Sequence, residues 1–414
     1  MALIYIYISS THPPSLDQYK GRLVVRGNFD MHTTCLLLIG SNLAKKQEKM
    51  VQFSSFLSGL TKNISPKSGK KRRINLGRET TEALAKEARK NGLLLTSPGN
   101  VYAKGSGNYI SAYSKGGNKG INQDCFIAWG GFGGKEDVMF CGVFDGHGPW
   151  GHLVGKRVKK VMPAYLLHYW QEAMAKCSVL INGKWVKNAN FDQFSVWKKS
   201  FIKACSTVDY DLELHPVIDS FYSGTAALTV IREGDLIVLA NVGDSRAVLG
   251  TTSDDGSLVA VQLTVDFKPS LPQEKERIYK SGGSVCEPDD EPGVSRIRAL
   301  IDETPEGPGL ALSRAFGDFC VKDFGLISEP DVTQRTLTTR DRFIILATDG
   351  VWDVVSNEKA VEIVSSSAAE RDESAKRVVE YAAAQWKCKR PGYAADDISV
   401  VCVFFNNPSS SSQQ

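Results

Sequence analysis

A carboxylate, a glycine and a histidine follow one another at the end of an apolar run in this 414-residue chain. Residues 138–144 are apolar enough to form a buried strand, and Asp145, Gly146 and His147 come directly after it. A carboxylate at a strand end can bind a hard cation, and a glycine lets its own carbonyl approach the same ion. Histidine exchanges protons near neutral pH. These residue types in this order predict metal-assisted hydrolysis.

Two further apolar runs carry acidic residues at their ends. Residues 343–348 lead into Asp349, while Asp396 and Asp397 precede the run 398–405. Because these runs are far apart in the sequence, we expect the fold to assemble their ends into one site. Ligation by carboxylates alone indicates Mg²⁺ or Mn²⁺ rather than zinc.

Eight short motifs occur in a fixed order along the chain. They are NQD at 122–124, FDGHG at 144–148, SGTAA at 223–227, ANVGDSRAVL at 240–249, LALSRAFGD at 310–318, ISEPD at 327–331, ATDGVWDVV at 347–355 and DDISVVCVF at 396–404. With this series the chain resembles the PPM-type, metal-dependent serine/threonine protein phosphatases (protein phosphatase type 2C) over residues 105–405. Its insertions resemble those of the plant branch.

The resemblance implies a fold and an activity. The implied fold is of class α+β, a sandwich of two antiparallel β-sheets flanked by helices on both faces; the strand and helix pattern alone indicates only α+β. The implied activity is hydrolysis of phosphoserine and phosphothreonine in phosphoproteins, by a water activated at a centre of two Mg²⁺ or Mn²⁺ ions.

The resemblance also assigns metal ligands. They are Asp145, Gly146, Asp349, Asp396 and Asp124. Asp145 would bridge both ions, Gly146 would bind through its carbonyl, and Asp124 would be a direct or an outer ligand. Asp397 occupies a position where the family often has Asn, so it is an alternative ligand to Asp396. The resemblance favours Asp396.

Two residues match catalytic positions of the family. His147 matches the proposed general acid, which protonates the leaving alkoxide. Lys119 stands where the family commonly has an arginine that binds the phosphate. Lysine keeps the positive charge but lacks the bidentate fork of arginine.

Other positions depart from the family pattern and leave a third ion open. Gln123 stands where many relatives have an acidic residue, so the second ion would depend more on bound waters. Tyr222 stands where many relatives have an aspartate that supports an accessory ion, for which Asp219 is a possible substitute. Asp353 matches another position that supports the accessory ion, and without that aspartate we expect it to lie near the ion without binding it directly.

The remaining signature positions are interpreted as structural turns and ion pairs. They are Asp244, Ser245, Arg246, Arg314, Gly317 and Asp318. The segment 281–309 is rich in Gly, Pro, Asp and Glu, which predicts a mobile flap that shapes substrate choice. It holds no Trp, which disfavours the regulation of the hormone-receptor-controlled plant relatives, whose flap Trp docks the receptor.

Composition and charge restrict the class of protein. The chain is 42% apolar and 23% charged, as in globular proteins, and its net charge of +4 argues against dedicated nucleic-acid binding. Its nine cysteines form no CxxC pair, which favours free thiols in a reducing compartment, cytoplasmic or nuclear. No apolar stretch approaches the roughly 20 residues that span a bilayer. We expect a monomer.

Three regions are expected along the chain. Residues 1–100 form a largely irregular extension, 101–406 the phosphatase domain, and 407–414 a disordered tail. The basic run at 70–73 is either a solvated linker or a patch for nuclear import or an acidic partner. Helices are expected at 80–90, 151–170, 194–214, 271–281, 356–366 and 371–388, and a hairpin at 226–240.

An alternative function is a pseudophosphatase that binds metal but has lost turnover. The departures at Gln123 and Tyr222 motivate it. The argument against it is the retention of Asp145, His147, Asp349 and Asp396. An assay with Mn²⁺ and a chromogenic phosphate ester would separate the two functions.

Overall fold

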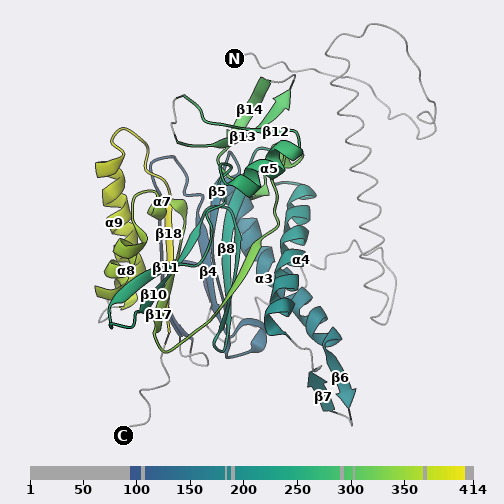
Figure 1. Ribbon diagram of the computed structural model, residues 1–414, viewed down its shortest axis with the longest axis vertical. Helices are drawn as coiled ribbons and strands as arrows, with labels where there is room; N and C mark the ends of the chain where they lie inside the picture. Colours follow the sequence, from purple (N-terminus) through teal and green to yellow (C-terminus); the bar gives the residue numbers. More distant parts are fainter. Residues whose placement is uncertain are drawn as a thin grey trace, which may run out of the picture. The chain divides into compact units, whose positions relative to one another are not determined.

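Two antiparallel β-sheets face one another in the computed structural model (Figure 1). The first has the strand order β1-β4-β5-β8-β9-β16, with β15 paired to β8. Its strands are Leu94–Leu95 (β1), Cys125–Gly130 (β4), Val138–His147 (β5), Gly224–Glu233 (β8), Leu236–Val242 (β9), Phe316–Gly317 (β15) and Asp331–Thr336 (β16). The predicted hairpin is β8–β9, whose turn contains Gly234 with φ of 62°.

The second sheet has the strand order β11-β10-β17-β18-β3-β2. Its strands are Gly99–Ala103 (β2), Asn108–Lys115 (β3), Arg246–Thr252 (β10), Leu258–Gln262 (β11), Asp341–Ala347 (β17) and Ile398–Phe404 (β18). All pairings between these strands are antiparallel. The predicted strands at 343–348 and 398–405 are thus the two neighbouring central strands of this sheet.

The apolar core lies in three layers. Side chains such as Val143, Leu228, Ile344 and Val401 fill the space between the sheets and are 0% exposed. Their neighbours along the strands point outward, where helices bury them. Because a strand alternates its side chains between two faces, burial of both faces explains why these strands are apolar throughout.

Helices cover the outer face of each sheet. Gly151–Lys176 (α3) and Gln193–Glu213 (α4) pack on the first sheet, and Asp349–Trp352 (α7), Asn357–Ser366 (α8) and Ser374–Lys389 (α9) pack on the second. Figure 1 shows α3 and α4 in blue-green on one side and α8 and α9 in yellow on the other. The predicted sandwich with helices on both faces is confirmed.

Smaller elements lie outside the two sheets. Pro272–Lys280 (α5) leads into a three-stranded sheet of Gly283–Cys286 (β12), Arg296–Ile301 (β13) and Thr304–Leu310 (β14). The segment predicted as a flap therefore contains a sheet. The other elements are Phe132–Gly134 (η2), Ser178–Ile181 (β6), Lys184–Lys187 (β7), Phe319–Lys322 (α6) and Arg371–Glu373 (η3).

The structure describes residues 94–103, 108–181, 184–187, 192–289, 293–301, 304–366 and 371–405. The predicted helix at 80–90, the basic run at 70–73 and the tail at 407–414 lie outside these residues. Strands β1 and β2 begin before residue 101, and the domain boundary itself stays a prediction. Among the described helices, none is long and apolar enough to cross a bilayer. The eight cysteines in the described ranges are free thiols.

Candidate metal centre

The antiparallel pairing brings the acidic strand ends to one edge of the sandwich. Ala347 pairs with Val400 between β17 and β18, so Asp349, just after β17, lies at the same end as Asp396, just before β18. In the first sheet Cys125 pairs with Phe144, which sets the residues flanking this pair, Asp124 and Asp145, at the same end of β4 and β5.

The carboxylates of this cluster repel one another. Burial, and then the charges of Asp124, Asp396 and Asp244, raise the pKa of Asp145 well above its usual value. Burial and the charge of Asp145 do the same to the pKa of Asp349. The fold therefore gathers negative charge in a place where it costs free energy, which is typical of a cation site.

Asp124 is the most enclosed member of the cluster, at 6% exposure. Its Oδ2 accepts a hydrogen bond of 2.8 Å from Thr348 Oγ1, but its buried Oδ1 has no hydrogen-bond partner, and neither does buried Oε1 of the adjacent Gln123. Burial raises the pKa of Asp124. Two orphaned buried oxygens beside a carboxylate cluster fit a bound cation or its water ligands.

Asp396 and Asp397 have different surroundings. Asp397 accepts backbone hydrogen bonds from Gly117 (2.8 Å) and Gln123 (2.7 Å), so both of its oxygens hold the loop that follows β3. Asp396 Oδ2 lies 2.5 Å from Lys119 Nζ, and its side chain is 25% exposed. These contacts support Asp396 as the ligand and Asp397 as the residue that fixes the loop.

Gly146 occupies a position that has no room for a side chain. A Cβ there would lie 2.5 Å from the Gly151 carbonyl oxygen and 2.8 Å from that of Gln123. Next to it, the Asp145 carbonyl accepts a 2.9 Å hydrogen bond from Thr225 Oγ1. The close approach of the N-terminus of α3 and the NQD loop thus requires the glycine of this motif.

His147 ends β5 and contacts Asp318, for which the sequence alone predicts a structural role. Its Nε2 lies 2.6 Å from Oδ2 of Asp318, and 27% of the imidazole side chain is exposed. Burial alone would lower the pKa of His147, but the charge and hydrogen bond of Asp318 outweigh it and raise the pKa. No local sequence signal reports this contact, because the two residues are 171 positions apart.

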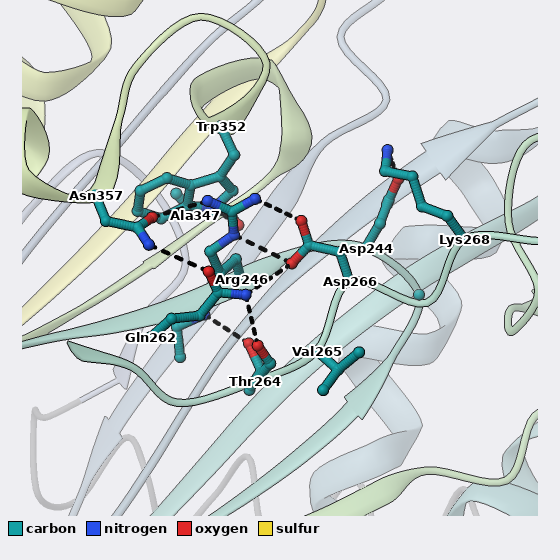
Figure 2. A network of polar contacts seen from close by, with 12 residues as sticks. Asp244, Arg246, Gln262, Thr264, Val265, Asp266, Lys268, Ala347, Trp352 and Asn357 are labelled. Carbon is teal, nitrogen blue, oxygen red and sulfur yellow. Dashed lines mark hydrogen bonds and ion pairs between the residues drawn. The ribbon is translucent and has the colours of Figure 1, made fainter. Parts of the chain in front are cut away.

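Figure 2 shows a network of polar contacts that includes the ion pairs of Lys268 and Arg246. Lys268 Nζ lies 2.9 Å from Asp244; although burial lowers the pKa of Lys268, Asp244 and then Asp349 raise it above its usual value. Arg246 binds Asp266 through two nitrogens, at 3.1 and 2.5 Å. Arg246 also donates to Asn357 (2.8 Å) and stacks on Trp352, as expected for structural ion pairs.

The positions considered for a third ion are used differently. Asp219 accepts from the Phe221 backbone (3.0 Å) in an exposed turn, and Tyr222 is 55% exposed. Asp353 lies 3.6 Å from Arg390, and burial raises its pKa. Asp219 therefore stabilises its own turn, and its contacts give no support to a third ion.

In the described ranges no three acidic, histidine or cysteine side chains form a ready-made coordination shell. The features that an oxygen-bound cation would satisfy are the orphaned buried oxygens and the mutually repelling carboxylates of the cluster.

Comparison with known proteins identifies the family. The family model "Protein phosphatase 2C" matches residues 119–390. "Probable protein phosphatase 2C 34" of Arabidopsis thaliana is 54% identical over 87% of this chain and 99% of its own length. "Probable protein phosphatase 2C 48" of Oryza sativa subsp. japonica is 49% identical over 87% of this chain and 100% of its own.

A solved structure agrees. The serine-threonine phosphatase 2C from Toxoplasma gondii has a TM-score of 0.64 and 26% identity, over 76% of this chain and 99% of that one. The chain belongs to the protein phosphatase 2C family, which makes it a protein phosphatase. The predicted family and enzyme class are confirmed.

Proposed function

We propose that this chain hydrolyses phosphoserine and phosphothreonine in phosphoproteins at a centre of two Mg²⁺ or Mn²⁺ ions. The observation that carries the proposal is the cluster of Asp124, Asp145 and Asp349, whose pKa values are all raised by burial and by one another. A fold that only needed stability would not collect like charges in this way.

The ligands are the Asp145, Asp349 and Asp396 carboxylates and the Gly146 carbonyl, with Asp124 as a direct or outer ligand. The ions, when bound, supply an activated water and neutralise charge on the phosphoryl group. Gln123 adds an uncharged oxygen next to this set.

Two side chains act on the substrate. His147 gives its proton to the serine or threonine oxygen as the phosphorus–oxygen bond breaks, so that an alcohol leaves rather than an alkoxide. Lys119, whose side chain is 54% exposed beside Asp396, presents its ammonium to the phosphate at the rim of the site. Lysine attracts the phosphate as a point charge.

The pseudophosphatase alternative is not favoured, because the chain belongs to a family of protein phosphatases and its near relatives carry that name. The proposal includes a monomer that acts on phosphoproteins in the cytoplasm, the nucleus or both.

The test measures phosphate release from a phosphothreonine peptide by the full chain. We expect no turnover in excess chelator, and recovery with millimolar Mg²⁺ or Mn²⁺ but not with equal Ca²⁺. Isothermal titration calorimetry of metal-free protein should show Mg²⁺ binding that Asp145→Asn weakens. Full activity in chelator would overturn the two-ion centre, and binding without turnover would favour the pseudophosphatase.

A further inference from the structure

Asp318 and His147 form a carboxylate–imidazole pair beside the metal centre. The distance from Asp318 Oδ2 to His147 Nε2 is 2.6 Å, and only 6% of the Asp318 side chain is exposed. Because a carboxylate only accepts hydrogen bonds, Nε2 must be the donor. Nδ1 is then the ring nitrogen left to interact with a substrate.

The backbone of Asp318 is held in an unusual conformation. Its φ and ψ are 51° and 46°, and it is the one non-glycine residue with positive φ among those that the structure describes. This left-handed conformation is unfavourable for an ordinary residue, and less so for Asp and Asn. Such strain persists where surrounding contacts fix it, and it clusters at functional sites.

Neighbouring contacts fix this position. The Asp318 backbone N–H donates to the Ser223 carbonyl (3.0 Å), and the Gly317 N–H donates to Asp209 (2.9 Å). Lys322 binds the other oxygen of Asp209 at 2.8 Å. The junction between β15 and α6 is therefore anchored on both sides of the Asp318 side chain.

The sheet leaves room for the Asp318 carboxylate. Gly224 pairs with His147 between β5 and β8, and with Gly317 between β15 and β8. A Cβ on Gly224 would lie 1.9 Å from Asp318 Oδ2. The glycine of the SGTAA motif thus lets the carboxylate reach the imidazole across three neighbouring strands.

We propose that Asp318 is the positioning residue of His147: it holds the imidazole through Nε2 so that Nδ1 carries the proton given to the leaving oxygen. A carboxylate bound to one imidazole nitrogen commonly fixes the orientation and tautomer that the other nitrogen needs. The inference rests on the proposed role of His147 as general acid.

The test compares Asp318→Asn with wild type on two substrates in saturating Mg²⁺. Asn has the same size and tolerates the left-handed conformation, so the fold should persist. We expect kcat on a phosphothreonine peptide to fall about 10–100-fold, by analogy with the loss seen when the hydrogen-bonded partner of a metal-binding histidine is removed. On p-nitrophenyl phosphate, whose leaving group needs no proton, the loss should stay below about threefold.

Asp209→Asn is the matched control. It changes a carboxylate at the same junction that binds Gly317 and Lys322 but not His147. It should leave the ratio of the two activities unchanged. The double variant with His147→Gln should lose no more than His147→Gln alone, because both changes remove the same proton donor. Equal losses on both substrates in Asp318→Asn would overturn the inference.

A second readout does not depend on turnover. Long-range ¹H–¹⁵N spectra of the full chain, with the His147 signal identified by His147→Gln, should show Nε2 protonated in wild type and altered in Asp318→Asn. If His147→Gln lowers phosphothreonine turnover selectively while Asp318→Asn changes neither the spectrum nor turnover, Asp318 has no such role and the proposed function stands. If wild type shows no metal-dependent turnover, the proposed function itself fails.

Discussion

Two clusters that contain buried carboxylates differ in how far the chain's own cations neutralise them. Glu274 of α5 is 2% exposed and receives two hydrogen bonds each from Arg277 (2.8 and 2.8 Å) and Arg314 (3.0 and 2.8 Å). Ser313 adds a fifth at 2.7 Å. Burial raises the pKa of Glu274, but these partners outweigh it and lower the pKa to about 2.

In the cluster at the metal centre, the chain's own cations do not neutralise the buried carboxylates. There burial and neighbouring carboxylates raise the pKa values of Asp145 and Asp349, and two lysines at this site are already paired, Lys119 with Asp396 and Lys268 with Asp244. A carboxylate that the chain neutralises with its own arginines contributes to structure. A group of carboxylates left without enough cations is prepared to bind one from solution.

Asp349→Asn should give the largest effect on activity. Removing one carboxylate of the metal centre should lower kcat/KM on a phosphothreonine peptide by about 10³-fold, a loss of the size seen when one preorganised electrostatic group is removed. Metal-free protein should unfold at the same or a higher urea concentration than wild type, because one of the repelling charges is gone. Asp323→Asn, at an exposed aspartate, is the control and should change neither quantity.

Glu274→Gln should lower stability strongly while changing activity little, the reverse of Asp349→Asn. It leaves Arg277 and Arg314 buried beside an uncharged partner, which should lower the free energy of unfolding by about 3 kcal/mol. Urea unfolding with and without Mg²⁺ measures this loss, which should be the same in both. Activity of the folded fraction should stay within about threefold of wild type. A stable Glu274→Gln protein that lost its metal affinity would contradict the division between the two clusters.

The fall in the free energy of unfolding at acid pH is a second test of Glu274. Because the folded pKa of Glu274, about 2, lies below its ordinary value of 4.5, the stabilisation is complete above pH 4.5. It is lost progressively as the pH falls from 4.5 toward 2. Glu274→Gln should therefore have a shallower loss of stability over this window, measured by urea unfolding at fixed pH steps. Parallel curves for the two proteins would show that another group dominates.

The strands and helices that carry the centre could be predicted from sequence, for local reasons. The apolar run 138–144 is followed by Asp145 and Gly146, and the run 398–405 is preceded by Asp396 and Asp397. The helices expected at 151–170 and 194–214 correspond to α3 and α4, although α3 continues to Lys176. β5 extends the first run to His147, because Asp145 and Gly146 keep pairing with β8. The carboxylates at strand ends could be located for the same reason.

The contacts between those elements could not be predicted. The sequence indicates only a structural turn or ion pair at Asp318, and it is the register of β15 on β8 that brings this residue to His147. The preference for Asp396 over Asp397 came from the resemblance, since adjacent aspartates look alike in sequence. The two residues differ because Asp397 accepts hydrogen bonds from two backbone N–H groups of another loop.

His147→Gln should have a smaller effect than Asp349→Asn, and one that depends on the leaving group. A threonine alkoxide needs a proton and nitrophenolate does not, so phosphothreonine peptides should slow by roughly 10²-fold, the usual size of a general-acid effect. Hydrolysis of p-nitrophenyl phosphate should fall much less. Rapid-quench measurement of the chemical step is needed because slow product release could hide the difference. Equal losses would indicate that His147 positions Asp145 and Gly146.

The smallest effect is expected at Lys119. This lysine lies at the metal centre and also neutralises one of its carboxylates, Asp396. Its ammonium lies 2.5 Å from Asp396, so in the absence of metal it is the chain's own cation at the edge of the centre. Lys119→Met should therefore tighten Mg²⁺ binding, because a competing positive charge is removed. The side chain is 54% exposed and the pair is screened by solvent, so the gain should be only about two- to fivefold.

Lys119→Met should at the same time weaken binding of the phosphopeptide, because the positive charge at the rim also attracts phosphate. KM should rise severalfold and the Mg²⁺ dissociation constant, measured by calorimetry, should fall, with both changes shrinking at higher salt. Lys119→Arg keeps the charge and adds a bidentate fork, so it should leave Mg²⁺ affinity near wild type and lower KM. If Lys119→Met instead weakens Mg²⁺ binding, the ammonium supports the centre rather than competing for it, and Asp396 belongs with the carboxylates that the chain neutralises itself.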